Sequence, residues 1–297
     1  MTFVEKLRSA LPDLRIVENA PMAKYTSFRI GGPATIVLPK SCEELVEVYR
    51  FCILHKERPL ILGAGTNILA PDAGLTRIVL CTRDLTAVRY LGGGLLEAEC
   101  GISMAKLACY ARDLSLTGTE FAAGIPGTVG GGVFMNAGAY GGEMARIVVK
   151  TQALLPDGSL CEIEGDAHDF SYRHSVFEEK EAVILKTQIS LQPSEKDVVT
   201  EKMRELARKR SASQPLDLPS AGSTFKRPTG GYAAALIDAA GLKGNGVGAA
   251  AVSEKHAGFV VNLGGATAQD VIATMRYIQD RVYETSGILL EPEVRIW

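Results

Sequence analysis

Residues 120–132 read Glu-Phe-Ala-Ala-Gly-Ile-Pro-Gly-Thr-Val-Gly-Gly-Gly, and this stretch says most about the fold. Nine of the 31 glycines fall between residues 118 and 142. Glycine loses more conformational freedom on folding than any other residue, so a dense run lowers stability unless the backbone needs it. Such a run suits a place where the main chain approaches a flat or anionic ligand, and the small residues 136–139 extend it. A purely structural glycine-rich loop is the alternative.

A second glycine segment, Leu-Gly-Ala-Gly-Thr-Asn at 62–67, follows an expected short strand. Asp84, 21 residues after Gly63, invites comparison with the dinucleotide-binding βαβ motif. That motif is disfavoured because Ile68 replaces its third glycine, and residues 71–74 (Pro-Asp-Ala-Gly) break the helix that should follow. A turn whose backbone N–H groups cradle a phosphate remains open, as does a plain strand-ending turn.

The hydrophobic patterns around these segments predict short strands mixed with helices, an α+β fold rather than a regular βαβ repeat. We expect helices at 1–20, leading into a loop at Pro12, and at 41–56, 103–114, 195–210, 231–241 and 267–286. We expect strands at 28–38, 59–62, 77–81, 86–90, 95–100, 147–155, 182–191, 257–262 and 293–297. A Pro-Asp-Gly turn at 156–158 is expected to join the strands 147–155 and 182–191.

Composition narrows the classes of function. The 297 residues carry a net charge of −2, which gives no reason to expect nucleic acid as a partner. The six cysteines form no C-x-x-C pair, so we expect reduced thiols and no metal site. No apolar h-region opens the chain, and no apolar run approaches the ~20 residues that span a bilayer. These features predict a cytoplasmic protein that does not enter membranes.

Three polar segments stand apart from their apolar surroundings. They are Ser-Tyr-Arg-His-Ser at 171–175, Ala-Gly-Ser-Thr-Phe-Lys-Arg-Pro at 221–228, and the last strand, where Glu293 and Arg295 face the same side. Taken singly, each is typical of solvated surface. The second segment puts a hydroxyl on a glycine turn beside two cations.

The order of these segments resembles the UDP-N-acetylenolpyruvoylglucosamine reductase family. The matching motifs are Tyr25-Thr26-Ser27-Phe28-Arg29-Ile30-Gly31-Gly32, Gly63-x-Gly65-x-Asn67, Gly124-Ile125-Pro126-Gly127-Thr128-Val129-Gly130-Gly131, Tyr172-Arg173-x-Ser175, Gly222-Ser223-x-Phe225-Lys226, Ser253-Glu254-Lys255-His256-Ala257-Gly258 and Glu291-Pro292-Glu293-Val294-Arg295. The first three motifs resemble the wider FAD-binding fold of vanillyl-alcohol-type oxidases. The last four resemble the reductase alone.

The resemblance implies a two-subdomain FAD-binding fold with a small α+β substrate-binding domain. It places FAD-binding subdomain 1 at residues 1–80 and subdomain 2 at 81–195. The UDP-sugar domain follows at 196–285, and a C-terminal strand at 286–297 returns to the FAD domain. Only 50 residues separate Arg173 from Ser223. This spacing is similar to the shorter type of the family, which lacks an inserted tyrosine loop.

The resemblance also implies roles for individual residues. The catalytic residues would be Arg173, Ser223 and Glu293, and no metal is expected. The cofactor-binding residues would be Tyr25, Arg29, Gly63, Ala64, Gly65, Thr66, Asn67, Gly124, Ile125, Pro126, Gly127, Thr128, Gly130, Gly131, Asn136, Ala137 and Arg295. The substrate-binding residues would be Tyr172, Lys226, Arg227 and His256. The segment 244–248 departs from the family pattern, which leaves some nucleotide contacts open.

The implied reaction is reduction of an enolpyruvyl UDP-sugar by NADPH through FAD, in peptidoglycan precursor synthesis. NADPH and the sugar nucleotide would use one pocket in turn, and the enzyme would be a monomer. Two alternatives remain from the sequence. One is a flavin-dependent alcohol or lactone oxidase of the same cofactor fold, and the other is a non-enzymatic nucleotide-sugar binding module.

Overall fold

The computed structural model describes residues 1–297, which divide into two compact units. Unit 1 consists of residues 1–17, 36–64 and 77–209, and unit 2 of residues 18–35, 65–76 and 210–297. Each unit draws on three separate stretches, so the chain crosses between the units several times before the last stretch of unit 2. None of the helices is long and apolar enough to cross a membrane.

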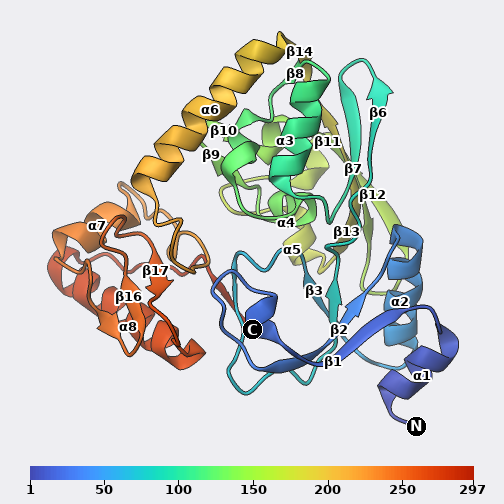
Figure 1. The fold of residues 1–297 in the computed structure, drawn as a ribbon, viewed down its shortest axis with the longest axis horizontal. Coiled ribbons are helices and arrows are strands. Elements are labelled where there is room, and N and C mark those ends of the chain that lie inside the picture. The colour runs from blue at the N-terminus through green and yellow to red at the C-terminus, as the bar shows by residue number, and fades with distance from the viewer. The chain divides into compact units, whose positions relative to one another are not determined.

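Helices and short strands are mixed along the chain without a regular βαβ repeat, which is the α+β class (Figure 1). The helices are α1 (Phe3–Ala10), α2 (Cys42–Leu54), α3 (Met104–Asp113), α4 (Val129–Phe134), α5 (Val176–Glu179), α6 (Lys196–Ser213), α7 (Ala233–Ala239) and α8 (Ala268–Ser286). The 3₁₀ turns are η1 (Met22–Lys24), η2 (Glu120–Gly124), η3 (Met144–Arg146) and η4 (Gly165–His168). The strands are β1 (Arg15–Pro21), β2 (Pro33–Leu38), β3 (Leu60–Leu62), β4 (Ile68–Leu69), β5 (Val79–Cys81), β6 (Val88–Gly92), β7 (Leu95–Glu99), β8 (Leu116–Thr117), β9 (Gly138–Ala139), β10 (Gly142–Glu143), β11 (Val148–Leu154), β12 (Leu160–Glu164), β13 (Val183–Ser190), β14 (Gln192–Pro193), β15 (Gly246–Val247), β16 (Ala250–Val252), β17 (Val260–Asn262) and β18 (Arg295–Ile296).

Unit 1 is built around an antiparallel sheet of five strands in the order β12-β11-β13-β7-β6 (Figure 1). Alternate side chains of β13 and β7 are buried, so one face of the sheet enters the core. Helix α4 packs against β13 and β7 on this face. A second sheet, β1-β2-β5-β3, contains parallel pairs between β2, β5 and β3. One continuous apolar core joins these layers, with Leu80, Leu96 and Phe177 fully buried in it.

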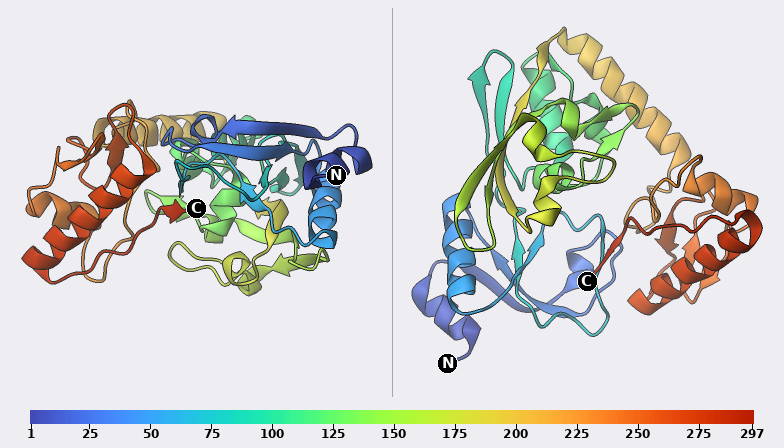
Figure 2. Two further views of the ribbon diagram at one scale, coloured as in Figure 1. Left: turned by 90° about the horizontal axis from the view of Figure 1, so that it is seen from below. Right: turned by 180° about the vertical axis from the view of Figure 1, so that it is seen from behind.

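Unit 2 packs helix α8 against the antiparallel sheet β15-β16-β17 (Figure 2). The helix begins at a capping box, in which Thr267 and Asp270 each accept a backbone N–H of the other. Its buried face, which includes Val271, Ile278 and Val282, lies in a core of its own. Gly287 ends the helix in the left-handed conformation that such a cap requires.

The last strand of the chain belongs to unit 2 and pairs with an early one. Strand β18 lies parallel to β4, with Arg295 opposite Ile68 and Ile296 opposite Leu69. The Arg295 N–H donates to the Asn67 carbonyl over 3.0 Å, and the Trp297 N–H donates to the Leu69 carbonyl over 3.0 Å. The polar residues at the end of the chain are therefore fixed beside the segment 65–69.

Some sequence expectations about elements were wrong. The first helix ends at Ala10, and residues 15–21 form strand β1 instead of continuing it. The turn at 156–158 joins β11 to β12, a hairpin partner that the sequence reading omitted, and not to β13. Residues 129–134 form helix α4, because Thr128 caps its first turn even though three of the six residues are glycine.

Candidate active site

A tight turn carries Arg173 in unit 1. Ser171 and His174 exchange backbone hydrogen bonds of 3.2 Å in both directions, and Arg173 lies between them with φ of 58°. A non-glycine residue enters this left-handed region only when its surroundings hold it there. The Arg173 guanidinium lies 4.9 Å from the centre of the Tyr172 ring, within the range of a cation–π contact.

The Arg173 turn is fastened to the end of helix α4 by two buried side chains. Asn136 donates from its amide to the Ser171 carbonyl over 3.0 Å and to a Glu143 carboxylate oxygen over 3.3 Å. Its amide oxygen accepts the Ala145 N–H over 2.9 Å. On the other side of the turn, the buried Ser175 hydroxyl donates to the Phe134 carbonyl over 2.7 Å. Because Ser171 and Ser175 are both hydrogen-bonded to the end of α4, the backbone from which the Arg173 side chain extends is held in place.

The two glycine-rich segments meet within unit 1. Gly63 follows β3 and lies so close to Thr128 that a Cβ on this residue would stand 2.5 Å from the Thr128 hydroxyl oxygen. Thr128 also accepts the Gly131 N–H over 3.3 Å. Pro126 and Gly131 are exposed beside them, so side-chain-poor backbone forms a surface at this point. Such a surface can receive the flat ring or the diphosphate of a dinucleotide.

One residue at this surface, Arg83, was not predicted from the sequence. Arg83 donates from its guanidinium to the Gly63 carbonyl over 3.3 Å and to the Ala64 carbonyl over 2.9 Å. Both carbonyls of the glycine turn are thereby held by a cation. An arginine two residues after a short strand gave no motif to detect, and only the fold brings it to residues 63–64.

In unit 2, the segment around Tyr25 packs against the second half of the same glycine motif. Gly65 has φ of 68°, and a Cβ there would lie 2.1 Å from the Tyr25 carbonyl oxygen. The Ser27 N–H donates to the Gly65 carbonyl over 2.9 Å, and the Ser27 hydroxyl donates to the Ser220 carbonyl over 2.6 Å. Arg29 is exposed. These contacts place Tyr25 and Gly65, two of the expected cofactor residues of unit 2, side by side.

Ser223 and Glu293 lie on neighbouring backbones of unit 2. The Glu293 N–H donates to the Thr224 carbonyl over 2.8 Å, and the Asn67 amide donates to the Glu293 carbonyl over 3.2 Å. Phe225 and Pro292 form an isolated β-bridge. The buried Thr224 hydroxyl accepts the Val260 N–H over 2.9 Å, which ties this turn to β17. Glu293 is thus a direct backbone partner of Thr224, the residue that follows Ser223, although the two segments lie far apart in the sequence.

The expected substrate residues of unit 2 have local partners. Lys226 is ion-paired with Glu291, and the Arg227 guanidinium lies 4.5 Å from the centre of the Tyr232 ring. His256 lines a cavity of about 220 Å³ whose other residues are Ala234, Ala235, Asp238, Lys243, Lys255 and Ala257. Burial lowers the pKa of the His256 imidazole. Lys226 and Arg227 do not line this cavity.

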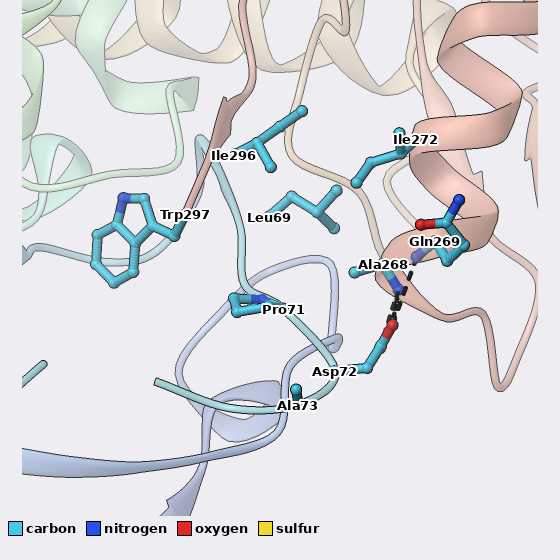
Figure 3. A pocket seen from close by; sticks show the side chains of 9 residues that line it. All are labelled: Leu69, Pro71, Asp72, Ala73, Ala268, Gln269, Ile272, Ile296 and Trp297. Carbon is cyan, nitrogen blue, oxygen red and sulfur yellow. Dashed lines mark hydrogen bonds between the residues drawn. The ribbon is translucent and has the colours of Figure 1, made fainter. Parts of the chain in front are cut away.

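A larger cavity of unit 2 has a different chemistry. It measures about 340 Å³, and its lining consists of Leu69, Pro71, Asp72, Ala73, Ala268, Gln269, Ile272, Ile296 and Trp297 (Figure 3). Its carboxylate, Asp72, accepts the Ala268 N–H with both oxygens, at 3.0 and 2.9 Å, and so caps helix α8. None of the expected site residues lines this cavity, and its one charged side chain, Asp72, is engaged in the cap.

Arg173 belongs to unit 1, whereas Ser223 and Glu293 belong to unit 2. The structure brings Ser223 and Glu293 together within unit 2, and it fixes the turn of Arg173 within unit 1. That Arg173, Ser223 and Glu293 lie together in one active site stays a prediction from the sequence.

Comparisons with known proteins agree on one family. The model described as "UDP-N-acetylenolpyruvoylglucosamine reductase, C-terminal domain" matches residues 214–297, and the model described as "FAD binding domain" matches residues 33–164. The protein named UDP-N-acetylenolpyruvoylglucosamine reductase from Caldanaerobacter subterraneus is 44% identical, over 99% of this chain and 97% of the relative. The protein of that name from Streptococcus agalactiae is 41% identical, over 99% of this chain and 98% of the relative.

Solved structures show the same division between family and wider fold. The UDP-N-acetylenolpyruvylglucosamine reductase of Thermus caldophilus superposes with a TM-score of 0.81 at 32% identity, covering 96% of this chain and 99% of that one. An alkyldihydroxyacetonephosphate synthase superposes with a TM-score of 0.51 at 18% identity, over 64% of this chain and 40% of that one. The second likeness concerns the fold alone.

Proposed function

The chain belongs to the UDP-N-acetylenolpyruvoylglucosamine reductase family, and from this premise we propose that it reduces the enolpyruvyl UDP-sugar to UDP-N-acetylmuramate with NADPH and FAD. The product is a precursor of peptidoglycan. One observation of geometry carries the proposal beyond the family. The Glu293 N–H donates to the carbonyl of Thr224, the residue after Ser223, so the two residues that carry the proposed hydroxyl and carboxyl lie on adjacent backbones.

The residues of the two glycine segments fit FAD. In unit 1, the exposed backbone at Pro126 and Gly131 lies beside Gly63, where no side chain could be accommodated. A ring or diphosphate can lie against such a surface and receive backbone N–H groups. Residues 63–64 and 124–131 would hold the cofactor in unit 1, and Tyr25 with residues 65–67 in unit 2. FAD, when bound, accepts hydride from NADPH and gives it to the substrate alkene.

Arg173 would bind the substrate carboxylate. When hydride reaches the terminal alkene carbon, negative charge spreads into that carboxylate as an enolate. A guanidinium stays charged and matches the two carboxylate oxygens with its planar fork. The left-handed turn and the Asn136 bond to Ser171 hold this cation before the charge develops. Losing such a preorganised contact typically costs about 10²–10³ in rate.

Ser223 would donate the proton that completes the reduction. A serine hydroxyl is a weak acid, but an enolate carbon is a strong base, so a positioned hydroxyl suffices. Glu293, half-buried beside the same turn, would hydrogen-bond the substrate carboxylate in its protonated form. Together with Arg173 these groups would stabilise the charge where it appears and remove it by protonation.

We further infer that NADPH and the enolpyruvyl UDP-sugar use one pocket in turn, and that the enzyme works as a cytoplasmic monomer. Hydride enters and leaves through the same reactive ring, which supports a shared pocket. All six cysteines are free thiols, and four of them are buried, as expected where thiols stay reduced. Lys226 and Arg227 supply cations suited to the diphosphate.

Spectroscopy of the two half-reactions tests the proposal. The purified protein should be yellow, and anaerobic NADPH should bleach the flavin absorbance. Addition of the enolpyruvyl UDP-sugar should then restore the absorbance stoichiometrically, with formation of the muramate product. A flavin that dioxygen reoxidises readily, while the UDP-sugar leaves it reduced, would instead indicate an oxidase.

A further inference from the structure

Three ligand-type side chains converge beside the Arg173 turn in unit 1. Asp169 follows η4, His174 closes the turn, and Glu179 ends α5. Nε2 of His174 lies 3.7 Å from Oδ2 of Asp169 and 3.7 Å from Oε1 of Glu179. The ligand atoms of the three residues all lie within 4.8 Å of one another. Neither the sequence motifs nor the reaction assigns a role to this group.

The distances do not fit direct hydrogen bonds. An N–H···O hydrogen bond spans about 2.7–3.2 Å, and both imidazole–carboxylate distances exceed that range. Two carboxylates are thus gathered around one ring nitrogen without being bonded to it. Asp169 holds this place with a left-handed backbone, φ 48° and ψ 45°. The two carboxylates are exposed, so their mutual repulsion is screened by water, and a cation between them would lower it further.

A metal ion satisfies the same distances. Two sides of the triangle of ligand atoms measure 3.7 Å and the third is at most 4.8 Å. By plane geometry, the point equidistant from three such atoms lies about 2.0–2.4 Å from each, and Zn²⁺ binds His nitrogen and carboxylate oxygen at about 2.0–2.2 Å. One imidazole with two carboxylates is a donor set that suits zinc and similar ions.

We propose that Asp169, His174 and Glu179 form a binding site for a divalent transition-metal ion such as Zn²⁺. The three ligands come from three consecutive pieces of backbone that surround residues 171–173. A bound ion fastens Asp169 to Glu179 across the turn and so restrains the segment that carries Arg173. The two exposed carboxylates leave the remaining coordination positions to water. The binding itself is independent of the reaction proposed above.

The chain offers a matched control. Glu178 lies next to Glu179, and its Oε2 is 3.9 Å from Nδ1, the other nitrogen of the same ring. An ion on Nε2 is not bound by Glu178, whereas diffuse attraction to negative charge would involve both glutamates equally. Glu178→Gln and Glu179→Gln remove the same charge from adjacent positions. A difference in zinc affinity between these two variants therefore reports coordination by Glu179.

The first experiment is a titration of chelator-treated, flavin-loaded enzyme with ZnCl₂ in a calorimeter. We expect one ion per chain. His174→Asn, Asp169→Asn and Glu179→Gln should each weaken binding at least about tenfold, since even residues that only support metal ligands contribute roughly 10–100-fold. Glu178→Gln should bind like the wild type. Equal losses in the two glutamate variants, or unchanged binding in His174→Asn, would overturn the proposal.

A second experiment identifies the histidine that binds the ion. The chain has four histidines, at positions 55, 168, 174 and 256. Nitrogen-correlated NMR of their rings should show one set of signals shifted by Zn²⁺, and His174→Asn should remove that set from the spectrum. Zinc captured by the partly exposed thiols of Cys109 and Cys161 would leave all four rings unshifted. That result, with stoichiometric binding, would refute a site at His174.

Discussion

Asn136 donates a 3.0 Å hydrogen bond to the carbonyl oxygen of Ser171 and thereby holds the turn on which Arg173 lies. The bond joins the end of a glycine-rich helix to a segment far along the chain. Its side chain is buried, and each of its polar atoms has a partner. The residue was predicted as a cofactor contact, and the structure adds a supporting role beneath the turn.

Asn136→Ala should therefore slow catalysis through the turn of Arg173, and not through a contact of its own with the substrate. Three hydrogen bonds are lost, and buried partners left unsatisfied cost about 1–3 kcal/mol each. A displacement of a catalytic group by about 1 Å can cost on the order of 10² in rate. We expect kcat to fall by about that factor, together with a lower Tm. Stopped-flow reoxidation of the NADPH-reduced flavin by the UDP-sugar, together with thermal unfolding, measures both effects. A variant with lowered Tm but unchanged reoxidation would show that the turn does not need Asn136.

Ser223→Ala should separate the two half-reactions. Bleaching of the flavin by NADPH needs no proton from this hydroxyl, so its rate should stay near that of the wild type. Reoxidation by the enolpyruvyl substrate should fall by orders of magnitude, because general acids contribute about 10²–10⁴ in rate. Anaerobic stopped-flow absorbance follows each step. Equal slowing of both steps would reduce Ser223 to a structural turn residue.

Gly131→Ala should weaken FAD binding while the protein remains stable. A Cβ at this exposed position would meet one atom within 4 Å, the Thr128 hydroxyl oxygen at 3.5 Å. Alanine is favoured over glycine in a helix by about 0.5–1 kcal/mol, so helix α4 should tolerate it. The methyl group would nevertheless lie on the proposed cofactor surface. Fluorescence titration of the deflavinated protein with FAD should show weaker binding, and unchanged affinity would place the cofactor elsewhere.

Asp72→Ala should destabilise helix α8. The carboxylate accepts the Ala268 N–H at the start of that helix, in addition to the cap from Thr267 (Figure 3). Loss of an N-terminal cap costs roughly 0.5–2 kcal/mol. Asp72→Asn keeps an oxygen acceptor and should lose less. Chemical denaturation of the wild type and both variants measures these differences, and an Asp72→Ala variant as stable as the wild type would mean that the Asp72 oxygens contribute nothing to the cap.

His168 should make the protein less stable in mild acid. Its ring is buried between Phe170 and Phe177, Nε2 lies 3.0 Å from the Thr151 hydroxyl oxygen, and burial lowers the pKa of the imidazole below 6.5. Between the lowered pKa and 6.5 the unfolded chain binds more protons than the folded one. The stability is therefore complete above about pH 6.5 and declines as the pH falls through that value, by up to about 1.4 kcal/mol per pH unit.

His168→Gln isolates this contribution. The variant cannot titrate, so its unfolding free energy should depend less on pH between 5 and 6.5 than that of the wild type. Part of the dependence should persist, because burial also lowers the pKa of His256. Urea unfolding at several pH values measures the slopes. Parallel slopes for wild type and variant would mean that His168 titrates alike in both states.

The sequence predicted α2 and α8 well, because Ser41 and Thr267 are strong caps before amphipathic periods. It missed the short strand β4, since two residues carry no period of their own, whereas the expected strand at 293–297 contains β18. These strands exist only because partners distant in the chain pair with them. The hydrophobic patterns predicted the α+β class and the motifs predicted the family, whereas the contacts of Arg83 with residues 63–64 exist only in the folded chain.

The pairing of β18 with β4 also constrains how the protein is made. Asn67 and Leu69 receive their backbone partners from Arg295 and Trp297, which the ribosome adds last among these residues. At roughly 5–20 residues per second, the early strand emerges on the order of ten to fifty seconds before its mate. During that interval the short apolar strand β4 lacks its backbone partner β18. Nascent chains stalled before residue 295 should therefore be more sensitive to protease in this region than released ones.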